Sequence, residues 1–151
     1  MVWGCMGWNG VGMLIEFEGI MNDKQYVDIL ERGVMESVEK LELDEEEFYF
    51  QQDNDPKHTS KLAYNWFEEK GIQLLKWLAQ SPGINPIEHL WTHVKKKLHQ
   101  YPSPPTSLHE LWDRLAVEWN GIPAETCQRP IESMPRRCEA VIKAKGGHTK
   151  Y

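Results

Sequence analysis

The chain has 151 residues, of which 40% are hydrophobic, and this is enough for one domain with a core of its own. No stretch approaches the roughly 18 apolar residues that cross a bilayer, so we expect no membrane span and no membrane partner. The net charge of −6 argues against a protein that wraps DNA, which would be basic overall. Residues 1–56 carry a net charge of −11, and residues 57–151 carry a net charge of +5. The second half of the chain can therefore contact phosphates on one face. An ordinary solvated surface explains the same charges.

The first half of the chain alternates between predicted strands and predicted helices. Residues 2–8 and 11–18 predict two strands joined at Asn9-Gly10, a strong hairpin signal because both residues tolerate positive φ. Asn22 or Asp23 then caps the first helix. The remaining elements of this half are a helix over residues 24–41, a strand over 48–52, a helix over 61–70 with Leu62, Ala63, Trp66 and Phe67 directed inward, and a strand over 72–78.

The second half is predicted to be helical. Asn85-Pro86 opens a helix that runs to about residue 100, and the Pro-rich linker 101–106 ends it because proline cannot continue a helix. Ser107 and Glu110 predict a capping box for the next helix. That helix has Leu108, Leu111, Trp112, Leu115 and Trp119 on one face; C-terminal helices fill residues 107–145, and a basic tail over 146–151 follows.

Residues 1–100 therefore predict an α/β fold, in which helices pack on a mixed sheet. The chain begins directly inside a predicted strand, so we expect a segment upstream of this strand to be missing. Its first residues have neither the basic nor the apolar region of a signal peptide. Cys5, Cys127 and Cys138 are odd in number and far apart in the sequence, which predicts free thiols in a reducing compartment.

Asp53 lies where a hydrophobic strand ends. Ligands collect at the carboxyl ends of strands in α/β sheets, so a carboxylate here can reach solvent and a metal ion. Alternation places Asp53 with Tyr49 on one face of the strand and Phe48 with Phe50 on the other. An Asx-turn before the next proline explains Asp55 better than a ligand role does, whereas for Asp53 the turn and the ligand role stay equally open.

Glu88 lies in the first turn of the helix that Asn85-Pro86 opens. An apolar stripe runs along this helix, and Glu88 lies at its edge together with Lys95, where a side chain can remain in water. A capping box with Asn85, together with the helix dipole, explains a first-turn carboxylate without any ligand role. Taken alone, Glu88 is better explained as a cap than as a ligand. The stripe comprises Ile87, Leu90, Trp91, Val94 and Leu98.

Several rare motifs occur along the chain in a fixed order. They are Met1-Val2-Trp3-Gly4-Cys5, Phe50-Gln51-Gln52-Asp53-Asn54-Asp55-Pro56-Lys57-His58-Thr59, Gln80-Ser81-Pro82-Gly83-Ile84-Asn85-Pro86-Ile87-Glu88-His89-Leu90-Trp91 and Ser133-Met134-Pro135-Arg136-Arg137. In these motifs the sequence resembles the mariner superfamily of cut-and-paste DNA transposases, over essentially the whole chain. The resemblance implies a ribonuclease H-like fold and the active site of a DDE superfamily endonuclease, built from three acidic residues.

By this resemblance Asp53 is the second acidic residue of the site and Glu88 is the third, so both would be catalytic and would bind metal. Asn54, His58 and Asn85 would belong to the loops that shape the site. The 34 residues between Asp53 and Glu88 match the spacing typical of the branch that ends in glutamate. The family's first acidic residue lies on a central strand just before the hairpin, so we expect this chain to be truncated at its N-terminus, without that strand.

The resemblance implies two Mg²⁺ or Mn²⁺ ions roughly 4 Å apart, which activate the attacking oxygen and neutralise charge on the phosphoryl group. Three carboxylates hold such hard ions in register and two do not, so the loss of one should remove most of the rate. Glu16 and Glu18 lie on an outer strand of the family fold and cannot be assumed to substitute. Gly83 stands where the family usually has aspartate, which loosens the approach to Glu88.

The resemblance also implies DNA as the partner, both as transposon ends and as target, together with a nuclear location, and it is compatible with a homodimer. Among the basic residues Lys95 is the best candidate for a contact with a DNA phosphate, because it shares the Glu88 edge of its helix. The weaker candidates are Lys96, Arg136, Arg137, Lys143 and Lys145.

The favoured function is metal-dependent DNA cleavage and strand transfer in transposition, impaired here by the loss of the first aspartate. The alternative is a non-catalytic transposon remnant that acts, if at all, as a domain for association with protein or DNA. A sheet without its central strand would also leave two edges unpaired, so a third expectation is a chain that does not fold stably alone.

Overall fold

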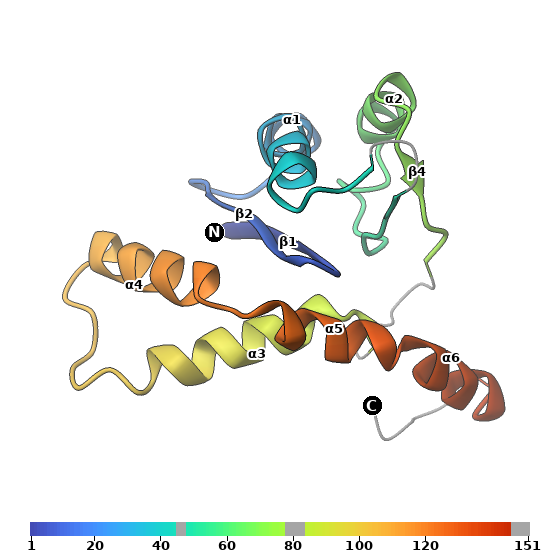
Figure 1. The fold of residues 1–151 in the computed structure, drawn as a ribbon. Helices are drawn as coiled ribbons and strands as arrows, with labels where there is room; N and C mark the ends of the chain where they lie inside the picture. Colours follow the sequence, from blue (N-terminus) through green and yellow to red (C-terminus); the bar gives the residue numbers. More distant parts are fainter. Residues whose placement is uncertain (45–47, 78–83, 146–151) are drawn as a thin grey trace. The chain divides into compact units, whose positions relative to one another are not determined.

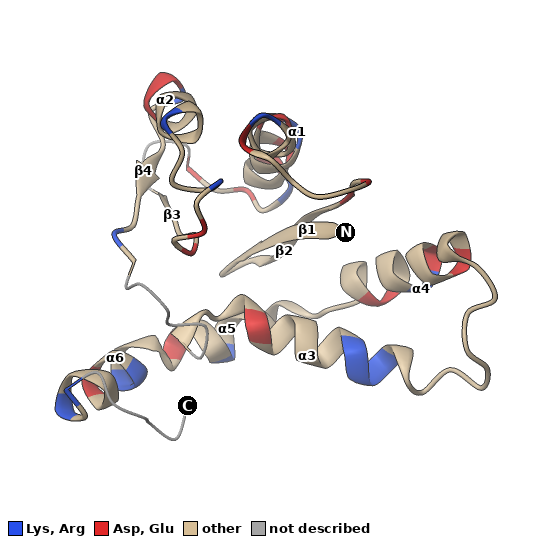
Figure 2. Ribbon diagram, turned by 180° about the vertical axis from the view of Figure 1, so that it is seen from behind, with Lys and Arg blue, Asp and Glu red and all other residues tan. Residues whose placement is uncertain are grey.

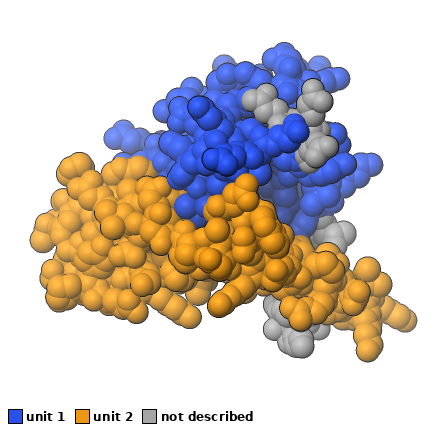
Figure 3. Space-filling model, in the orientation of Figure 1, with its two compact units in different colours: residues 1–5, 11–81 blue, residues 6–10, 82–151 orange. Residues whose placement is uncertain are grey.

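The computed structural model describes residues 1–44, 48–77 and 84–145 of the chain. It has two compact units, one made of residues 1–5 and 11–81 and the other of residues 6–10 and 82–151, which Figure 3 colours separately. Figure 1 shows the course of the chain and the labels of its elements. Within the described residues, no helix combines the length and the apolar character that a membrane crossing requires.

A β-hairpin opens the chain. Strand β1 (Val2–Gly7) pairs with β2 (Gly10–Glu16), and beside them Met1 and Phe17 exchange two hydrogen bonds of 2.8 and 3.0 Å, as antiparallel neighbours do. The turn lies at Trp8-Asn9, one residue before the predicted position. The reason is that Gly10 already belongs to β2, with a φ of 138° that glycine alone adopts readily.

Helix α1 (Asp23–Lys40) packs against this hairpin (Figure 1). A capping box begins the helix: the Asn22 side chain accepts from the backbone N–H of Gln25, and the Gln25 side chain accepts from that of Asn22. Gly33 lies where the helix meets the hairpin, since a Cβ atom there would come within 2.5 Å of the Trp3 ring. The close approach explains a glycine in mid-helix, where its propensity is poor.

Strands β3 (Tyr49–Phe50) and β4 (Gln73–Leu74) form a parallel pair, with Tyr49 opposite Gln73 and Phe50 opposite Leu74. Both strands are shorter than the sequence predicted. Within the described residues, the expected mixed sheet is therefore seen as two separate two-stranded sheets. Strand length depends on a hydrogen-bonded neighbour, and the pattern of one segment does not reveal how far its neighbour extends.

Helix α2 (Lys61–Glu69) connects β3 to β4 and buries Ala63, Trp66 and Phe67 as predicted. The prediction for Leu62 is wrong, because this side chain is 40% exposed. At 100° per residue Leu62 lies at the edge of the face that the other three residues form. The core of the first unit comprises Tyr26, Leu30, Val34, Val38, Ala63, Trp66, Phe67 and Ile72, and the partly buried Phe48 and Phe50 pack against it.

Glu31 joins α1 to α2 at the surface of this core. Its carboxylate accepts hydrogen bonds from the Trp66 indole N–H at 2.6 Å and from the Lys70 ammonium at 2.8 Å. The bond from Lys70, and then the bond from Trp66, lowers the pKa of Glu31. The carboxylate therefore stays ionised in mildly acidic solution and keeps both partners in place.

The second unit contains four helices within the described residues. They are α3 (Ile87–Leu98), α4 (Leu108–Asn120), α5 (Ala124–Glu132) and α6 (Met134–Lys143). Leu90 and Val94 of α3 are buried as predicted, and the Trp91 ring stacks on Trp119 of α4 with centroids 4.8 Å apart. The predicted apolar face of α4 is wrong at its start, because Leu108 is 80% exposed and Leu111 is 36% exposed.

The Pro-rich segment before α4 is held against that helix. Ser107 accepts from the backbone N–H of Glu110 at 3.1 Å, as the sequence predicted. The Glu110 carboxylate, however, accepts from the N–H and hydroxyl of Thr106 rather than from the N–H of Ser107. Glu110 therefore bonds one residue earlier in the chain than the glutamate of a standard capping box does. Arg114 pairs with Glu110, and its guanidinium lies 4.5 Å from the centroid of the Tyr101 ring.

Candidate active site

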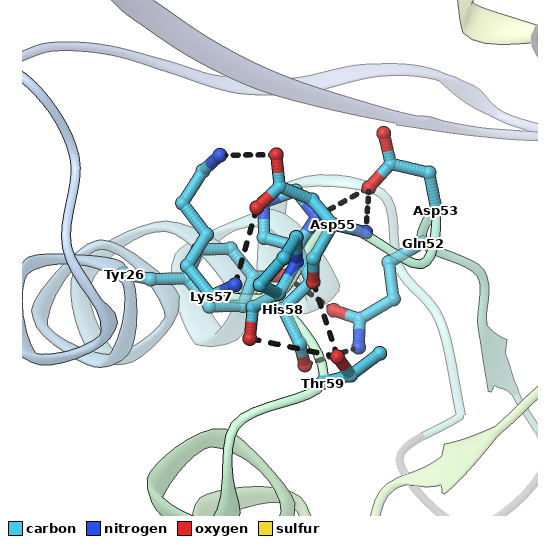
Figure 4. Close-up of polar contacts among 8 residues, drawn as sticks. Tyr26, Gln52, Asp53, Asp55, Lys57, His58 and Thr59 are labelled. Carbon is cyan, nitrogen blue, oxygen red and sulfur yellow. Dashed lines mark hydrogen bonds and ion pairs between the residues drawn. The ribbon is translucent and has the colours of Figure 1, made fainter.

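Asp53 lies in the loop that follows β3 (Figure 4). Its Oδ1 atom accepts from the backbone N–H of Asp55 at 3.2 Å and lies 2.5 Å from Nδ1 of His58. The side chain is 59% exposed, and its other oxygen has no hydrogen bond or ion pair with any described residue. One oxygen of Asp53 therefore closes an Asx-turn, and the ligand role that the sequence left open for this residue stays a prediction.

His58 is supported by α1 and by the end of β3. Its ring lies 4.2 Å from the Tyr26 ring, and its backbone carbonyl accepts from Nε2 of Gln52 at 2.9 Å. The Tyr26 hydroxyl donates to Oε1 of Gln52. Tyr26 is 1% exposed, and its burial, followed by the charges of Asp53 and Asp55, raises the pKa of its hydroxyl. Tyr26 thus remains a neutral donor, and it links the core to the loop that carries Asp53.

Asp55 has a structural role, as predicted. Its Oδ1 accepts from the backbone N–H of Lys57 at 3.1 Å, and its Oδ2 accepts from the Lys57 ammonium at 2.5 Å. The ammonium bond is the largest of the effects that lower the pKa of Asp55. Its backbone carbonyl also accepts from the N–H groups of His58 and Thr59. Both oxygens of Asp55 are engaged, which leaves Asp53 as the open carboxylate of this loop.

Asn54 joins the same loop to the segment after β4. Its Nδ2 donates to the backbone carbonyl of Trp77 at 3.0 Å. The parallel pairing of β3 with β4 explains the contact, because the carboxyl ends of parallel strands meet at one edge of a sheet. Asn54 therefore fixes the loop between Asp53 and Asp55 to the neighbouring strand.

Glu88 lies in the first turn of α3 and is exposed. Its carboxylate has no hydrogen bond or ion pair with any described residue, while its backbone carbonyl accepts from the Thr92 hydroxyl at 2.9 Å. The predicted capping box is wrong, because the N-cap residue is Pro86 and no side chain caps the helix. Proline has no N–H to donate to the Glu88 carboxylate. The Asn85 side chain accepts a long bond of 3.4 Å from the N–H of Ile87, and its backbone carbonyl accepts from the N–H of Glu88 at 3.3 Å.

The two carboxylates belong to different units of the chain, Asp53 to the first and Glu88 to the second. Each is therefore described within its own unit, and their approach to one another stays a prediction. Among the described residues, no group of three or more His, Cys, Asp or Glu side chains gathers as a metal site. Each carboxylate by itself has the hard oxygen atoms that Mg²⁺ and Mn²⁺ prefer, with at least one of them unengaged.

The basic residues differ in accessibility. Lys95, Lys96 and Lys97 lie in the last turn of α3, which Figure 2 colours blue, at the opposite end of the helix from Glu88. All three side chains are exposed. Arg136, Lys143 and Lys145 are also exposed.

Arg137 is 4% exposed, and its guanidinium donates to Nε2 of His89. Burial, followed by the charge of Arg137, lowers the pKa of His89. The imidazole is therefore neutral and accepts this bond. Arg137 is consequently less accessible to a phosphate than its neighbour Arg136. Gly83 lies outside the described residues.

Sequence reasoning missed three residues of the Asp53 loop. Tyr26 was placed only within the helix predicted over residues 24–41, Gln52 only in a strand, and Lys57 only in a motif. The one usable signal was Tyr26, since a hydroxyl on a buried face needs a partner. Which residue supplies that partner depends on how α1 packs beside β3. The spacing of residues within one segment does not predict this packing.

A family model described as DDE superfamily endonuclease matches residues 2–110, a range that includes both Asp53 and Glu88. The chain belongs to this family. This match, together with the transposase relatives and the solved structures that follow, confirms the predicted resemblance to mariner transposases. The chain is 42% identical to the Tcb1 transposase of Caenorhabditis briggsae over 151 residues, all of this chain and 54% of that protein.

A further member, the Tc1 transposase of Caenorhabditis elegans, is 40% identical over the same length, again all of this chain and 54% of that protein. The chain thus spans about half the length of the curated relatives that it matches.

Solved structures establish the fold of this family member. A Mos1 transposase catalytic domain with raltegravir and Mg matches with a TM-score of 0.83 and 20% identity, covering 99% of this chain and 75% of that one. A Mos1 mariner paired end complex with Mn matches with a TM-score of 0.81 and 20% identity, covering 99% of this chain and 44% of that one. The ribonuclease H-like fold class predicted from the sequence is confirmed.

Proposed function

We propose that this chain supplies part of a metal-dependent site that cleaves DNA and transfers DNA strands in transposition. The observation that carries the proposal is the Asp53 carboxylate: His58 and Asp55 fix one oxygen, and no described residue binds the other. A fixed carboxylate with an open oxygen at the carboxyl end of a strand suits a ligand for a hard divalent cation. Membership of the DDE superfamily endonucleases supports this chemistry.

In this proposal Asp53 and Glu88 bind Mg²⁺ or Mn²⁺. His58 is a positioning residue, because it holds Oδ1 of Asp53 and directs the other oxygen outward. Asn54 keeps the loop beside β4, and Asn85 lies in the turn that leads into α3. When bound, two such ions would activate the attacking oxygen and neutralise charge on the phosphoryl group.

Calorimetry of Mn²⁺ binding to the whole chain tests the proposal. We expect Asp53→Asn to abolish a defined binding event and Glu88→Gln to weaken the same event, because each substitution removes an anionic oxygen ligand. Asp113→Asn and Glu125→Gln are matched controls: Asp113 is exposed, and Glu125 lies in the first turn of α5 as Glu88 does in α3. Neither control should change Mn²⁺ affinity.

Two outcomes would overturn the metal site. One is a binding event that neither Asp53→Asn nor Glu88→Gln changes, and the other is no binding to the wild type in the presence of DNA. DNA binding without any Mn²⁺ event would instead support the alternative, a non-catalytic domain for association with DNA.

We propose further that the activity of these 151 residues alone is impaired. An acidic triad requires a third carboxylate besides Asp53 and Glu88, and two carboxylates do not hold two ions in register. Nicking of supercoiled plasmid in Mn²⁺ measures this directly. We expect little nicking above the level of the Asp53→Asn variant; a rate that depends on Asp53 and exceeds that variant at least roughly a thousandfold would contradict the impairment.

DNA is the proposed partner, and the nucleus is the proposed location because transposition acts on chromosomal DNA. A fluorescent fusion of the whole chain tests the location, and exclusion from the nucleus would contradict it. We also propose a homodimer, as the family resemblance allows. Sedimentation of the chain with and without DNA tests this assembly, and a single monomeric species in both samples would reject it.

A further inference from the structure

A hollow of about 330 Å³ lies beside the Asp53 loop, wholly within the first unit. It is at the carboxyl-end edge of the β3–β4 pair, where open α/β sheets bind ligands. Asn54 lines it on the β3 side, Trp77 and Lys76 line it on the β4 side, and Tyr64 of α2 also lines it. Its volume is at the lower end of the roughly 300–1,000 Å³ typical of small-ligand sites.

The groups available in this hollow are those that bind a nucleotide. Tyr64 is 50% exposed and its ring is a surface for stacking, as is the partly buried indole of Trp77. Lys76 is exposed and has no ion pair or hydrogen bond with any described residue, so its ammonium is available to a phosphate. The amide of Asn54 donates to the Trp77 carbonyl through its nitrogen, and its side-chain oxygen is an acceptor that this bond does not use.

The hollow is also preformed. Gln52 forms part of its wall, and both ends of that amide are engaged, one by the Tyr26 hydroxyl and the other by the backbone of His58. Thr59 and Tyr64 lie at the N-terminus of α2, whose helix dipole favours an anion. A rigid wall lowers the entropy cost of holding a ligand.

We propose that this hollow binds a single unstacked nucleotide of the DNA on which the Asp53 site acts. The base stacks on Tyr64 or Trp77, and the adjoining phosphate pairs with Lys76. A space of this size admits one nucleotide and excludes a duplex. The proposal rests on the proposed function, because it takes the DNA of that site as the ligand; Asn54, which lines the hollow, directly follows Asp53 in the chain.

Fluorescence anisotropy of labelled DNA tests the inference, with the whole chain in EDTA so that metal binding does not contribute. The probes are a single-stranded thymidine decamer and a blunt 20-base-pair duplex. We expect the single strand to bind, and Tyr64→Ala and Trp77→Leu each to raise its dissociation constant by roughly 5- to 100-fold, the range for loss of one base–aromatic stack. Lys76→Ala should weaken binding and make it less sensitive to salt.

Tyr49→Ala and Lys24→Ala are the matched controls, because Tyr49 is 64% exposed, Lys24 is exposed, and neither lines the hollow. Circular dichroism and thermal unfolding identify any variant that fails to fold, and Tyr64→Phe, which keeps the ring, should then bind like the wild type. Equal single-strand affinity in Tyr64→Ala, Trp77→Leu and the wild type would overturn the inference, as would equal losses in the controls. The anisotropy assay contains no metal. Its result can therefore be interpreted even if the Mn²⁺ calorimetry shows no binding, and the two failures can be told apart.

Discussion

At the scale of the residue, the Asp53 carboxylate is defined by the asymmetry of its two oxygens. His58 and the N–H of Asp55 occupy one oxygen, and no described residue occupies the other. His58 can do this because Tyr26 and Gln52 hold its ring and its backbone. An aspartate in a free loop would rotate its carboxylate, and a ligand would have to order it at an entropy cost.

We predict that His58→Ala weakens Mn²⁺ binding roughly tenfold, as losses of a group that orients a metal ligand commonly do. His58→Asn should restore much of the affinity, because its amide N–H can occupy the place of Nδ1. Calorimetry of both variants measures the difference. If alanine and asparagine weaken binding equally, the ring contact with Tyr26 matters rather than the bond to Asp53; if neither changes it, His58 does not position the carboxylate.

The burial of each cysteine side chain determines how readily its thiol ionises. Cys5, Cys127 and Cys138 are all free, in agreement with the prediction from the sequence. Burial raises the pKa of the Cys5 thiol, and it raises the pKa of Cys127 to about 11, whereas Cys138 is exposed. Cys138 is accordingly the thiol with the best access to solvent.

At the scale of the element, helix caps and turns decide where each segment ends. Ser60 caps α2 and Asn22 caps α1, each through its side-chain oxygen. Helix α3 begins differently, on Pro86 and without a side-chain cap, and no described residue bonds to the Glu88 carboxylate in its first turn. The Pro-rich segment before α4 depends on Glu110, which binds Thr106 and Arg114.

Glu110 gives a prediction about pH. The Thr106 hydroxyl, followed by the Thr106 N–H and Arg114, lowers the pKa of Glu110 to about 2 from an ordinary value of 4.5. A carboxyl whose pKa is lower in the folded state stabilises that state above pH 4.5, and this contribution is lost as the pH falls towards 2. We therefore expect Glu110→Gln to lower the Tm at pH 7, and the difference from the wild type to shrink below pH 4.5.

Thermal unfolding between pH 2 and pH 7, followed by circular dichroism, measures this difference. Glu125→Gln is the control, since Glu125 is a first-turn glutamate of α5 and should give the same Tm as the wild type at every pH. A Tm difference for Glu110→Gln that stays constant down to pH 2 would show that the Thr106 and Arg114 contacts do not depend on the charge.

At the scale of the whole molecule, charge is divided between the two units. Residues 1–5 and 11–81 contain 16 acidic and 7 basic residues, a net charge of −9, whereas the remaining residues contain 7 acidic and 10 basic ones, a net charge of +3. By net charge alone, a polyanion such as DNA is attracted more strongly to the second unit than to the first, where the proposed nucleotide contact relies on the exposed Lys76. Lysines at the end of α3 are therefore better placed electrostatically for phosphates than those of α1.

We predict that Lys95→Ala makes duplex binding less dependent on salt. Each neutralised phosphate contributes about 0.9 to the slope of log affinity against log salt concentration, so loss of one contact should reduce the slope by about that amount. Anisotropy titrations between 50 and 200 mM salt, roughly the range over which such slopes are measured, provide the value. Lys24→Ala on α1 is the control. Equal slopes for the Lys95→Ala and Lys24→Ala variants would show that Lys95 does not contact a DNA phosphate.

The sequence by itself determined the order of the elements, the course of the α3 stripe and the family. Helical periodicity and turn residues act over a few neighbouring positions. They can therefore be recognised in the sequence without knowledge of any tertiary contact. Asp53 and Glu88 were predicted as site residues in the same way, from motifs in a fixed order, and their role stays a prediction.

Tertiary structure decided the features that depend on distant partners. The lengths of β3 and β4, the exposure of Leu62 and the support of His58 by Tyr26 and Gln52 each involve segments separated by many residues. The open oxygen of Asp53 belongs to the same class, because it results from a bond to His58 within a loop held by α1. Local spacing indicates which face of an element is apolar, but only packing determines which neighbour meets that face.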